Sequence, residues 1–547
     1  MLHASSPKLV QSKKGMVVAA EPIAAKVGAK ILAQGGNAVD AAVAVGFALA
    51  VTYPTAGNIG GGGFMNIRFA DGKTITIDYR EKAPLAATKN MYLDEKENFL
   101  SEKNLYGHLA SGVPGSVAGM LLALEKFGTL QRNDVIQPAV ELAEKGFPIH
   151  PRLATSLKEN NQKFSKFSGS IKSFTNNGKI YEAEEILRQP DLARTLQRII
   201  IDGKDGFYKS KTADLIVEEM KRGNGLITHE DLEKYQAVIR EPVKGTYRGY
   251  EIISMAPPSS GGIALLQLLK ILENYDLKSY GWNSAKSVHI LTEAMRRVYA
   301  DRAEYLGDPD FVKVPVNGLL SEKYLSERMQ TIDTVKATPS SKISHGNPVP
   351  YESEQTTHYS IVDQYGNCVS VTTTLNGGYG SHVVVNGAGF LLNNEMDDFS
   401  AKPGSPNMYG LIGSEANSIT PEKRMLSSMT PTIILKNGKP FMVIGTPGGS
   451  TIITTVLQVI INVIDFGMNI QEAINAPRIH HQWLPDKLMY EKNALSTETI
   501  EKLQSMGHTL EMRTGPSGLA EGIMFDGETG EMFGASDIRG YGAAVGN

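Results

Sequence analysis

A predicted β-hairpin in the second half of the chain constrains the fold more than any other stretch. Residues 356–363 read Thr-Thr-His-Tyr-Ser-Ile-Val-Asp, and residues 368–375 read Cys-Val-Ser-Val-Thr-Thr-Thr-Leu. Both segments are rich in the β-branched and aromatic residues that favour strands. Residues 364–367, Gln-Tyr-Gly-Asn, supply a turn between them. The simplest interpretation is an edge hairpin whose hydroxyl groups face water.

The same stretch also permits a catalytic interpretation, in which Thr356 is a nucleophile. A threonine hydroxyl needs a base at neutral pH, and an N-terminal threonine can use its own α-amine, which titrates near pH ~8. Because Thr356 lies inside the chain, this chemistry requires a cut between Gln355 and Thr356. The Thr356 hydroxyl could attack the Gln355 carbonyl and form an ester. Water would then open that ester and leave Thr356 as a new N-terminus.

Four motifs resemble the γ-glutamyltransferase family, also called γ-glutamyl transpeptidases. They are Gln-Thr-Thr-His-Tyr-Ser at 355–360, Leu-Asn-Asn-Glu-Met-Asp-Asp-Phe-Ser at 392–400, Leu-Ser-Ser-Met at 426–429 and Pro-Gly-Gly-Ser at 447–450. The resemblance extends over nearly the whole chain, with the motifs in the family's order. It implies an N-terminal-nucleophile hydrolase with an α+β fold, a four-layer αββα sandwich. It also implies fragments 1–355 and 356–547, which stay together as a heterodimer.

The amino-acid composition and net charge argue against a nucleic acid partner and against a disulfide or a cysteine metal cluster. The chain has 547 residues, a net charge of -3, 41% hydrophobic and 21% charged residues, which is ordinary for a globular protein. It has no basic block with interleaved aromatics, so we expect no nucleic acid partner. The single cysteine, Cys368, allows neither an internal disulfide nor a cysteine metal cluster, and we expect it to be buried. The resemblance implies neither metal nor organic cofactor.

No membrane span is expected. The most apolar run, residues 41–51, is shorter than the ~20 residues that cross a bilayer. The first residues lack the apolar core of a signal peptide. Because bacterial members of the family are commonly exported, the resemblance implies a periplasmic or secreted protein whose signal is missing from this sequence. A cytoplasmic protein is the alternative.

The rest of the chain alternates predicted helices and strand pairs. Hydrophobic periodicity predicts the following helices: 21–34, 41–51, 117–127, 263–272 and 287–305. Turn residues between apolar runs predict two further hairpins, 64–69 with 74–79 and 433–436 with 442–445. We expect Arg296, Arg297 and Asp301 to lie on a solvated helix face, residues 161–177 to form an exposed excursion, and residues 336–354 to be a flexible connector.

Residues 60–63 are four consecutive glycines. Such a run can cradle a phosphate, but its pattern fits neither a dinucleotide-binding loop nor a P-loop. Close backbone packing beside a site is the better interpretation, and the family places this run beside its nucleophile. His108 could act as a base in principle. An N-terminal amine makes such a base unnecessary, so we interpret His108 as structural.

Arg80 is the predicted anchor for a substrate carboxylate. Any single arginine could instead form a surface ion pair, but a guanidinium suits bidentate recognition of carboxylate. The resemblance assigns Arg80 to the α-carboxylate of the substrate and adds the hydroxyls of Ser427 and Ser428. It assigns the substrate ammonium group to three further residues, Asn376, Glu395 and Asp398. We interpret the neighbouring Asp397 as structural.

The remaining predicted roles concern the reaction itself. By resemblance, Thr374 on the returning strand orients Thr356, although a cross-strand threonine pair would look the same. The backbone N–H groups of Gly448 and Gly449 can point at one oxygen and form an oxyanion hole, and an ordinary type II turn is compatible with this role. The resemblance implies that residues 401–417 form a lid that carries Tyr409 over the substrate.

These roles predict a γ-glutamyltransferase and glutathione hydrolase. It would transfer the γ-glutamyl group of glutathione or another donor to water, an amino acid or a dipeptide. Alternatives on the same scaffold are a β-lactam acylase and a poly-γ-glutamate transpeptidase. A solute-binding protein is the alternative of another class, and it would remain a single uncut chain.

Overall fold

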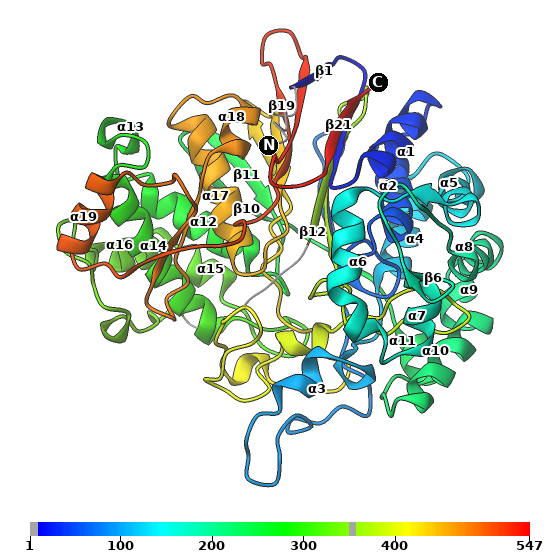
Figure 1. The fold of residues 1–547 in the computed structure, drawn as a ribbon. Helices are drawn as coiled ribbons and strands as arrows, with labels where there is room; N and C mark the ends of the chain where they lie inside the picture. The colour runs from blue at the N-terminus through cyan, green and yellow to red at the C-terminus, as the bar shows by residue number, and fades with distance from the viewer. Residues whose placement is uncertain (1–8, 349–356) are drawn as a thin grey trace.

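A computed structural model describes residues 9–348 and 357–547. In the part it describes, two seven-stranded sheets stack face to face and helices cover the outer face of each (Figure 1). This is the predicted four-layer αββα sandwich. The predicted cleavage residues, Gln355 and Thr356, lie outside the described residues.

The predicted hairpin forms the centre of the first sheet. Its strands, in order, are β21 (Ala543–Gly546), β2 (Met16–Ala19), β12 (Thr357–Val362), β13 (Cys368–Thr374), β3 (Gly62–Arg68), β4 (Thr74–Asp78) and β9 (Val238–Arg240). All neighbours are antiparallel. Because β12 pairs with β2 and β13 pairs with β3, the edge-hairpin interpretation is wrong. The sheet is covered on both faces, so the hydroxyls of Ser360, Ser370 and Thr372 are buried.

The second sheet packs against the inner face of the first. Its strands, in order, are β1 (Val10–Ser12), β20 (Met532–Ser536), β19 (Glu521–Phe525), β15 (Lys439–Gly445), β14 (Thr432–Lys436), β11 (Tyr250–Ser254) and β10 (Val243–Tyr247). The layer between the sheets is apolar: Val18 and Val362 from the first sheet pack with Val443 and Ile523 from the second. Cys368 lies in this layer and is buried, as predicted.

Helices cover the first sheet on its outer side (Figure 1). They include α1 (Pro22–Ala33), α2 (Ala38–Thr52), α4 (Ser116–Phe127), α5 (Arg132–Lys145), α6 (Pro151–Phe164), α7 (Ser168–Phe174), α8 (Pro190–Asp202), α9 (Asp205–Tyr208), α10 (Lys211–Arg222) and α11 (His229–Lys234). Asn37 and Asp40 begin α2 with a reciprocal capping box, and every residue of α2 is buried. The predicted exposed excursion at 161–177 is wrong in part: about half of its residues are exposed, but α6 and α7 bury Phe164 and Phe174 with ring centroids 5.0 Å apart.

A second helical layer covers the other sheet. It includes α12 (Gly261–Leu272), α13 (Leu277–Tyr280), α14 (Ala285–Tyr305), α15 (Val316–Leu319), α16 (Glu322–Gln330), α17 (Thr451–Ile464), α18 (Ile470–Asn475) and α19 (Thr497–Ser505). The smaller elements are α3 (Ser101–Leu105), β5 (Phe147–Pro148), β6 (Thr175–Asn176), β7 (Lys179–Ile180), β8 (Ile186–Leu187), β16 (Ile479–His480), β17 (Leu488–Tyr490) and β18 (Leu510–Met512). Among the helices of the described chain, none is both long and apolar enough to cross a bilayer.

The charged side of α14 is buried, so the prediction of a solvated face is wrong. Arg296 and Arg297 are each 1% exposed, and both pair with Glu293, which is fully buried. The Arg297 Nη1 to Glu293 Oε2 distance is 2.8 Å. Long charged side chains occupy the interior here because each finds a partner on the same helix or the next segment.

That next segment is the described part of the predicted connector, residues 336–348. Buried carboxylates hold its backbone: Thr338 N–H donates to Glu293 at 3.1 Å, and Gly346 N–H donates to Asp301 at 2.8 Å. Ser340 N–H donates to Asp486 at 2.8 Å. The prediction of flexibility is therefore wrong for residues 336–348, and residues 349–354 lie outside the described chain.

Candidate active site

The glycine run brings β3 against the end of β13. A side chain at Gly61 would collide with the carbonyl of Thr374, and one at Gly62 would collide with Glu81. Asn58, just before the run, donates from Nδ2 to the Thr374 carbonyl at 2.7 Å. The expectation of close backbone packing is confirmed. The run places β4 beside the end of the hairpin, and Arg80 lies two residues after β4 ends.

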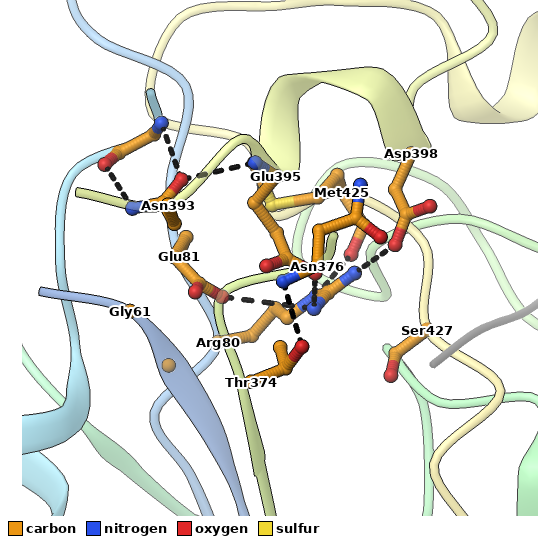
Figure 2. A network of polar contacts seen from close by, with 12 residues as sticks. Gly61, Arg80, Glu81, Thr374, Asn376, Asn393, Glu395, Asp398, Met425 and Ser427 are labelled. Carbon is orange, nitrogen blue, oxygen red and sulfur yellow. Dashed lines mark hydrogen bonds and ion pairs between the residues drawn. The ribbon is translucent and has the colours of Figure 1, made fainter. Parts of the chain in front are cut away.

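Arg80 lies at the centre of a buried cluster of charges (Figure 2). Its guanidinium pairs with Glu395 and with Asp398, the latter at 2.6 Å between Nη2 and Oδ2. It also donates to two backbone carbonyls, that of Met425 at 3.1 Å and that of Leu426 at 2.9 Å. The structure thus brings the predicted carboxylate anchor directly against two of the residues predicted to bind an ammonium group.

Glu81 is a member of this cluster that the sequence interpretation missed. Its carboxylate is 3.6 Å from Arg80 Nη1, is fully buried, and accepts no hydrogen bond within the described chain. One guanidinium faces the carboxyl groups of Glu81, Glu395 and Asp398. Burial raises the pKa of both Glu81 and Glu395. The sequence signal that could have identified Glu81 was its position directly after the predicted carboxylate anchor, Arg80.

The turn after β13 presents Asn376 toward this cluster. Asn376 has a φ of +71°, in the left-handed region that asparagine tolerates better than most residues. Its N–H donates to Thr374 Oγ1 at 2.7 Å, and its Nδ2 donates to the Asn394 carbonyl at 3.1 Å. Its Oδ1 is buried and has no hydrogen-bond partner in the described part of the chain. This oxygen is available to a donor such as an ammonium group.

Thr374 lies where the hairpin register brings the two strands together. Thr357 pairs with Thr373, so the neighbours of Thr356 and Thr374 are directly opposite in the ladder. Thr356 itself lies outside the described residues. The orientation of Thr356 by Thr374 therefore stays a prediction.

The short 3-10 turn η3 (Glu395–Asp398) carries the acidic residues, and Asn393 fixes it in place. Asn393 Oδ1 accepts from the N–H of Glu395 at 3.0 Å, and its Nδ2 donates to the Gly60 carbonyl at 2.9 Å. Asn393 was not predicted as a site residue. Its neighbour in the matched motif, Glu395, has one carboxylate oxygen, Oε2, with no hydrogen-bond partner in the described chain.

Asp397 does not pair with Arg80 but is held by residues outside the charge cluster. The structural role expected for it stays a prediction. Its Oδ1 accepts from Asn104 Nδ2 at 2.9 Å and its Oδ2 from the N–H of Met408 at 3.1 Å. Burial raises the pKa of Asp397 to about 7. Asp397 therefore ties η3 to the loop of residues 401–417.

Ser427 and Ser428 lie beyond the Leu426 carbonyl that binds Arg80. Figure 2 shows Ser427 on the same side of the cluster as Asp398. Ser427 Oγ accepts from the N–H of Met429 at 3.3 Å. Ser428 Oγ is buried and makes no hydrogen bond among the described residues. The two serines directly follow Leu426, whose carbonyl binds the guanidinium. Their role toward a substrate carboxylate stays a prediction.

Gly448 and Gly449 form the turn between β15 and α17. Their φ values of +143° and +60° lie in the region that favours glycine. The N–H of Thr451 closes the turn by donating to the Gly448 carbonyl at 3.1 Å. Within the described residues neither glycine N–H has a hydrogen-bond acceptor. Both N–H groups are therefore available to an oxyanion.

Tyr409 connects the predicted lid to both sides of the site. Its ring lies directly against Gly449, where any side chain would collide with it. Its hydroxyl donates to the Asn376 carbonyl at 2.8 Å. Asn407 Oδ1 accepts from the Tyr409 N–H at 3.0 Å and holds the loop in shape. Tyr409 therefore connects the turn of Gly448 and Gly449 with the turn that carries Asn376.

Two stacked antiparallel sheets between helical layers, with a central strand that begins one residue after Thr356, define an N-terminal-nucleophile hydrolase. The sequence matches the model of the Gamma-glutamyltranspeptidase family over residues 24–547, and the chain belongs to that family. It is 52% identical over 531 residues to the glutathione hydrolase proenzyme of Escherichia coli (strain K12), covering 97% of this chain and 91% of the relative. It is 41% identical to the glutathione hydrolase proenzyme of Bacillus subtilis (strain 168), covering 98% and 92%.

Solved structures agree with this assignment. The fold matches that of a cephalosporin acylase from Bacillus halodurans with a TM-score of 0.90 and 28% identity, covering 100% of this chain and 98% of the acylase. It matches the γ-glutamyltranspeptidase of Helicobacter pylori with a TM-score of 0.60 and 48% identity, covering 62% of this chain and 97% of that one. The scaffold is therefore common to enzymes whose names give different substrates.

Proposed function

We propose that the protein is a γ-glutamyltransferase and glutathione hydrolase that cuts itself before Thr356. The observation that carries the proposal is the buried cluster around Arg80, which offers both signs of charge to an α-amino acid head group. Unpaired polar atoms of Asn376 and Ser428 lie in the same region. Membership of the Gamma-glutamyltranspeptidase family and the proenzyme names of its relatives support the self-cleavage.

The proposed reaction uses these residues together with Thr356. The Thr356 hydroxyl attacks the γ-amide carbonyl of the donor, and the Thr356 α-amine takes the hydroxyl proton. The N–H groups of Gly448 and Gly449 hold the tetrahedral oxyanion, and each such donor is typically worth ~10²–10³ in rate. The C–N bond breaks, the leaving amine receives the proton, and a γ-glutamyl ester remains on Thr356. Water then gives glutamate, or an amino acid or peptide amine gives a new γ-glutamyl product.

Substrate recognition would exchange one set of ion pairs for another. Arg80 is paired with Glu395 and Asp398, and a bound zwitterion would enter between them. Its carboxylate would bind Arg80, Ser427 and Ser428, and its ammonium would bind the two acidic residues and Asn376. Every buried charge keeps an opposite partner through this exchange, which limits the cost of desolvation.

The fragments 1–355 and 356–547 would stay associated as a heterodimer after the cut. In the first sheet β2 from the larger fragment pairs with β12 and β21 from the smaller one. The second sheet likewise mixes strands of both. We also propose a periplasmic or secreted location, supported by the resemblance to exported bacterial enzymes. Cell fractionation followed by a γ-glutamyl donor assay tests this location.

A single assay separates this function from the alternatives. The purified protein is incubated with glutathione and glycylglycine, and glutamate and γ-glutamylglycylglycine are measured. We expect both products and two bands on a denaturing gel. A solute-binding protein gives one band and no product. A β-lactam acylase would release product from a glutaryl β-lactam, which lacks the α-ammonium group, faster than from glutathione.

Arg80→Lys is expected to lower kcat/KM for glutathione roughly tenfold to over a hundredfold while self-cleavage continues. Lysine keeps the charge but loses the planar fork, and a charge-assisted hydrogen bond is worth ~1.5–3 kcal/mol. Arg68→Lys is the matched control, because Arg68 is also buried but donates to the carbonyls of Gly366 and Gly438. Steady-state constants of Arg80→Lys that equal those of the control contradict the assignment.

The pH profile of kcat/KM is expected to rise through one ionisation near pH ~8, because the Thr356 α-amine must be neutral to act as the base. Burial lowers the pKa of His358 to about 3, so that imidazole stays neutral throughout the rise. His358 contacts Ser360 at 2.8 Å, and His108 contacts Glu219 at 3.1 Å. His358→Asn and His108→Asn should therefore keep the rise. A donor without an α-amine removes substrate ionisation from the profile, and loss of the rise in either variant would make a histidine the base.

A further inference from the structure

A cavity of about 540 Å³ opens beside the candidate active site, outside all the residues assigned so far. It lies at the first two turns of α6, next to the segments that precede β19 and β21. The lining residues used below are Tyr53, Thr55, Arg152, Glu159, Leu519 and Tyr541. Its volume is in the range of pockets that bind small molecules.

Two hydrogen bonds connect the walls of this cavity to the segments that carry candidate site residues. On one wall, Leu519 N–H donates to Thr446 Oγ1 at 2.8 Å, and Gly518 lies directly against Gly448 of the oxyanion turn. On the other wall, the Thr55 carbonyl accepts from the N–H of Tyr379, in the turn that follows Asn376, at 2.9 Å. The cavity is thus bounded by segments that contact the Gly448 turn on one side and the turn after Asn376 on the other.

The charges of the cavity lie at separate points along α6. Arg152, in the first turn, is exposed and makes no hydrogen bond or ion pair within the described chain. Glu159 lines the same cavity about two turns further along the helix. A carboxylate in the cavity is attracted to the Arg152 end and repelled from the Glu159 end. Arg152 can bind it through two parallel N–H donors.

The walls between these charges are aromatic and polar. Tyr541 stacks on His150 with ring centroids 3.8 Å apart and an interplanar angle of 17°. Tyr53 lines the cavity as well, and Thr55 Oγ1 is buried without a hydrogen-bond partner among the described residues. Apolar ring faces beside a hydroxyl suit the backbone and side chain of an amino acid or a short peptide.

We propose that this cavity is the acceptor site, which binds amino acids and short peptides through their free carboxylate, held by Arg152. The inference rests on the proposed function. The acceptor amine attacks the carbonyl carbon of the γ-glutamyl ester, a C–N bond forms, and the ester C–O bond breaks. The proton lost by the amine returns to the Thr356 oxygen through the Thr356 α-amine. In the reverse sense, the same cavity holds the cysteinylglycine part of glutathione.

The test compares two acceptors that differ only in charge, glycylglycine and glycylglycinamide, with γ-glutamyl-p-nitroanilide as donor. The parent enzyme is expected to prefer the acid, and Arg152→Gln is expected to lower kcat/KM for the acid about tenfold, the loss of one exposed charge-assisted contact. The amide acceptor and the hydrolysis of this donor, whose leaving group has no carboxylate, should be unchanged. Lys158→Gln is the control, because it removes the same charge from the same helix outside the cavity.

Several results would overturn the proposal. Equal use of acid and amide by the parent contradicts a carboxylate contact at Arg152. So does an Arg152→Gln variant that slows both acceptors alike, or a Lys158→Gln variant that behaves as Arg152→Gln does. Arg152→Lys, which keeps the charge, should recover part of the preference for the acid. If the parent hydrolyses no γ-glutamyl donor, the proposed function fails. If it does so without the acid preference, only the cavity assignment fails.

Discussion

Thr356→Ala is expected to give a single, inactive chain of 547 residues. The variant has no hydroxyl to attack the Gln355 carbonyl, so the ester that precedes the cut cannot form. It also has no nucleophile for the donor. The parent should separate on a denaturing gel into fragments 1–355 and 356–547, and intact mass should place the new N-terminus at Thr356. Donor hydrolysis by the variant should fall to background.

Two controls make this result specific. Thr356→Ser keeps both the hydroxyl and the future α-amine, so it should mature, more slowly, and turn over γ-glutamyl donors. Thr357→Ala changes the adjacent threonine at the start of β12 and should still be cut. A new N-terminus elsewhere, cutting of Thr356→Ala, or full activity of an uncut chain would each refute Thr356 as the nucleophile.

Glu293→Ala is expected to lower the free energy of unfolding by about 3–5 kcal/mol, because it leaves Arg296 and Arg297 buried without their shared carboxylate. It also removes the acceptor for the Thr338 N–H. Urea unfolding measured in the uncut Thr356→Ala background keeps the fragment number constant. Glu293 is fully buried on α14, so water cannot replace the lost carboxylate as a partner for the two arginines.

Glu304→Ala is the matched control for this substitution. Glu304 lies on the same helix but is exposed, and an exposed change of this kind costs at most about 0.5 kcal/mol. If both variants unfold at the same urea concentration, the buried pairs of α14 contribute little to stability. The expected difference between them isolates the effect of burial from that of helix propensity.

Local sequence patterns predicted the elements well but not their surroundings. The turn at 364–367 and the helix predicted at 41–51, which the structure extends to Ala38–Thr52, depend on neighbouring residues, and both are confirmed. The central position of β12 depends on β2, more than 300 residues away. The buried charges of α14 depend on Glu293 of the same helix and on the segment of residues 336–348 that covers it. A run of charged residues on a helix has the same sequence pattern whether the charges face water or pair with a buried carboxylate.

The site shows the same limit. Arg80, Glu395 and Asp398 were each predicted, and the structure brings them together. Their direct pairing was not foreseen, because Arg80 is separated from the two acidic residues by 315 and 318 positions. Glu81 and Asn393 were missed because they contact other site residues: Glu81 faces Arg80, and Asn393 fixes the η3 turn. The roles of these residues toward substrate stay predictions.

The mixed order of strands in both sheets has a consequence for the cut protein. Before cleavage, every strand belongs to one molecule, and folding is unimolecular. After cleavage, β2 must find β12 on a separate chain, and the same holds for the second sheet. Refolding then becomes bimolecular and depends on protein concentration. In a dilute environment, separated fragments would rarely meet again. The lifetime of the mature enzyme would then depend on a low rate of unfolding.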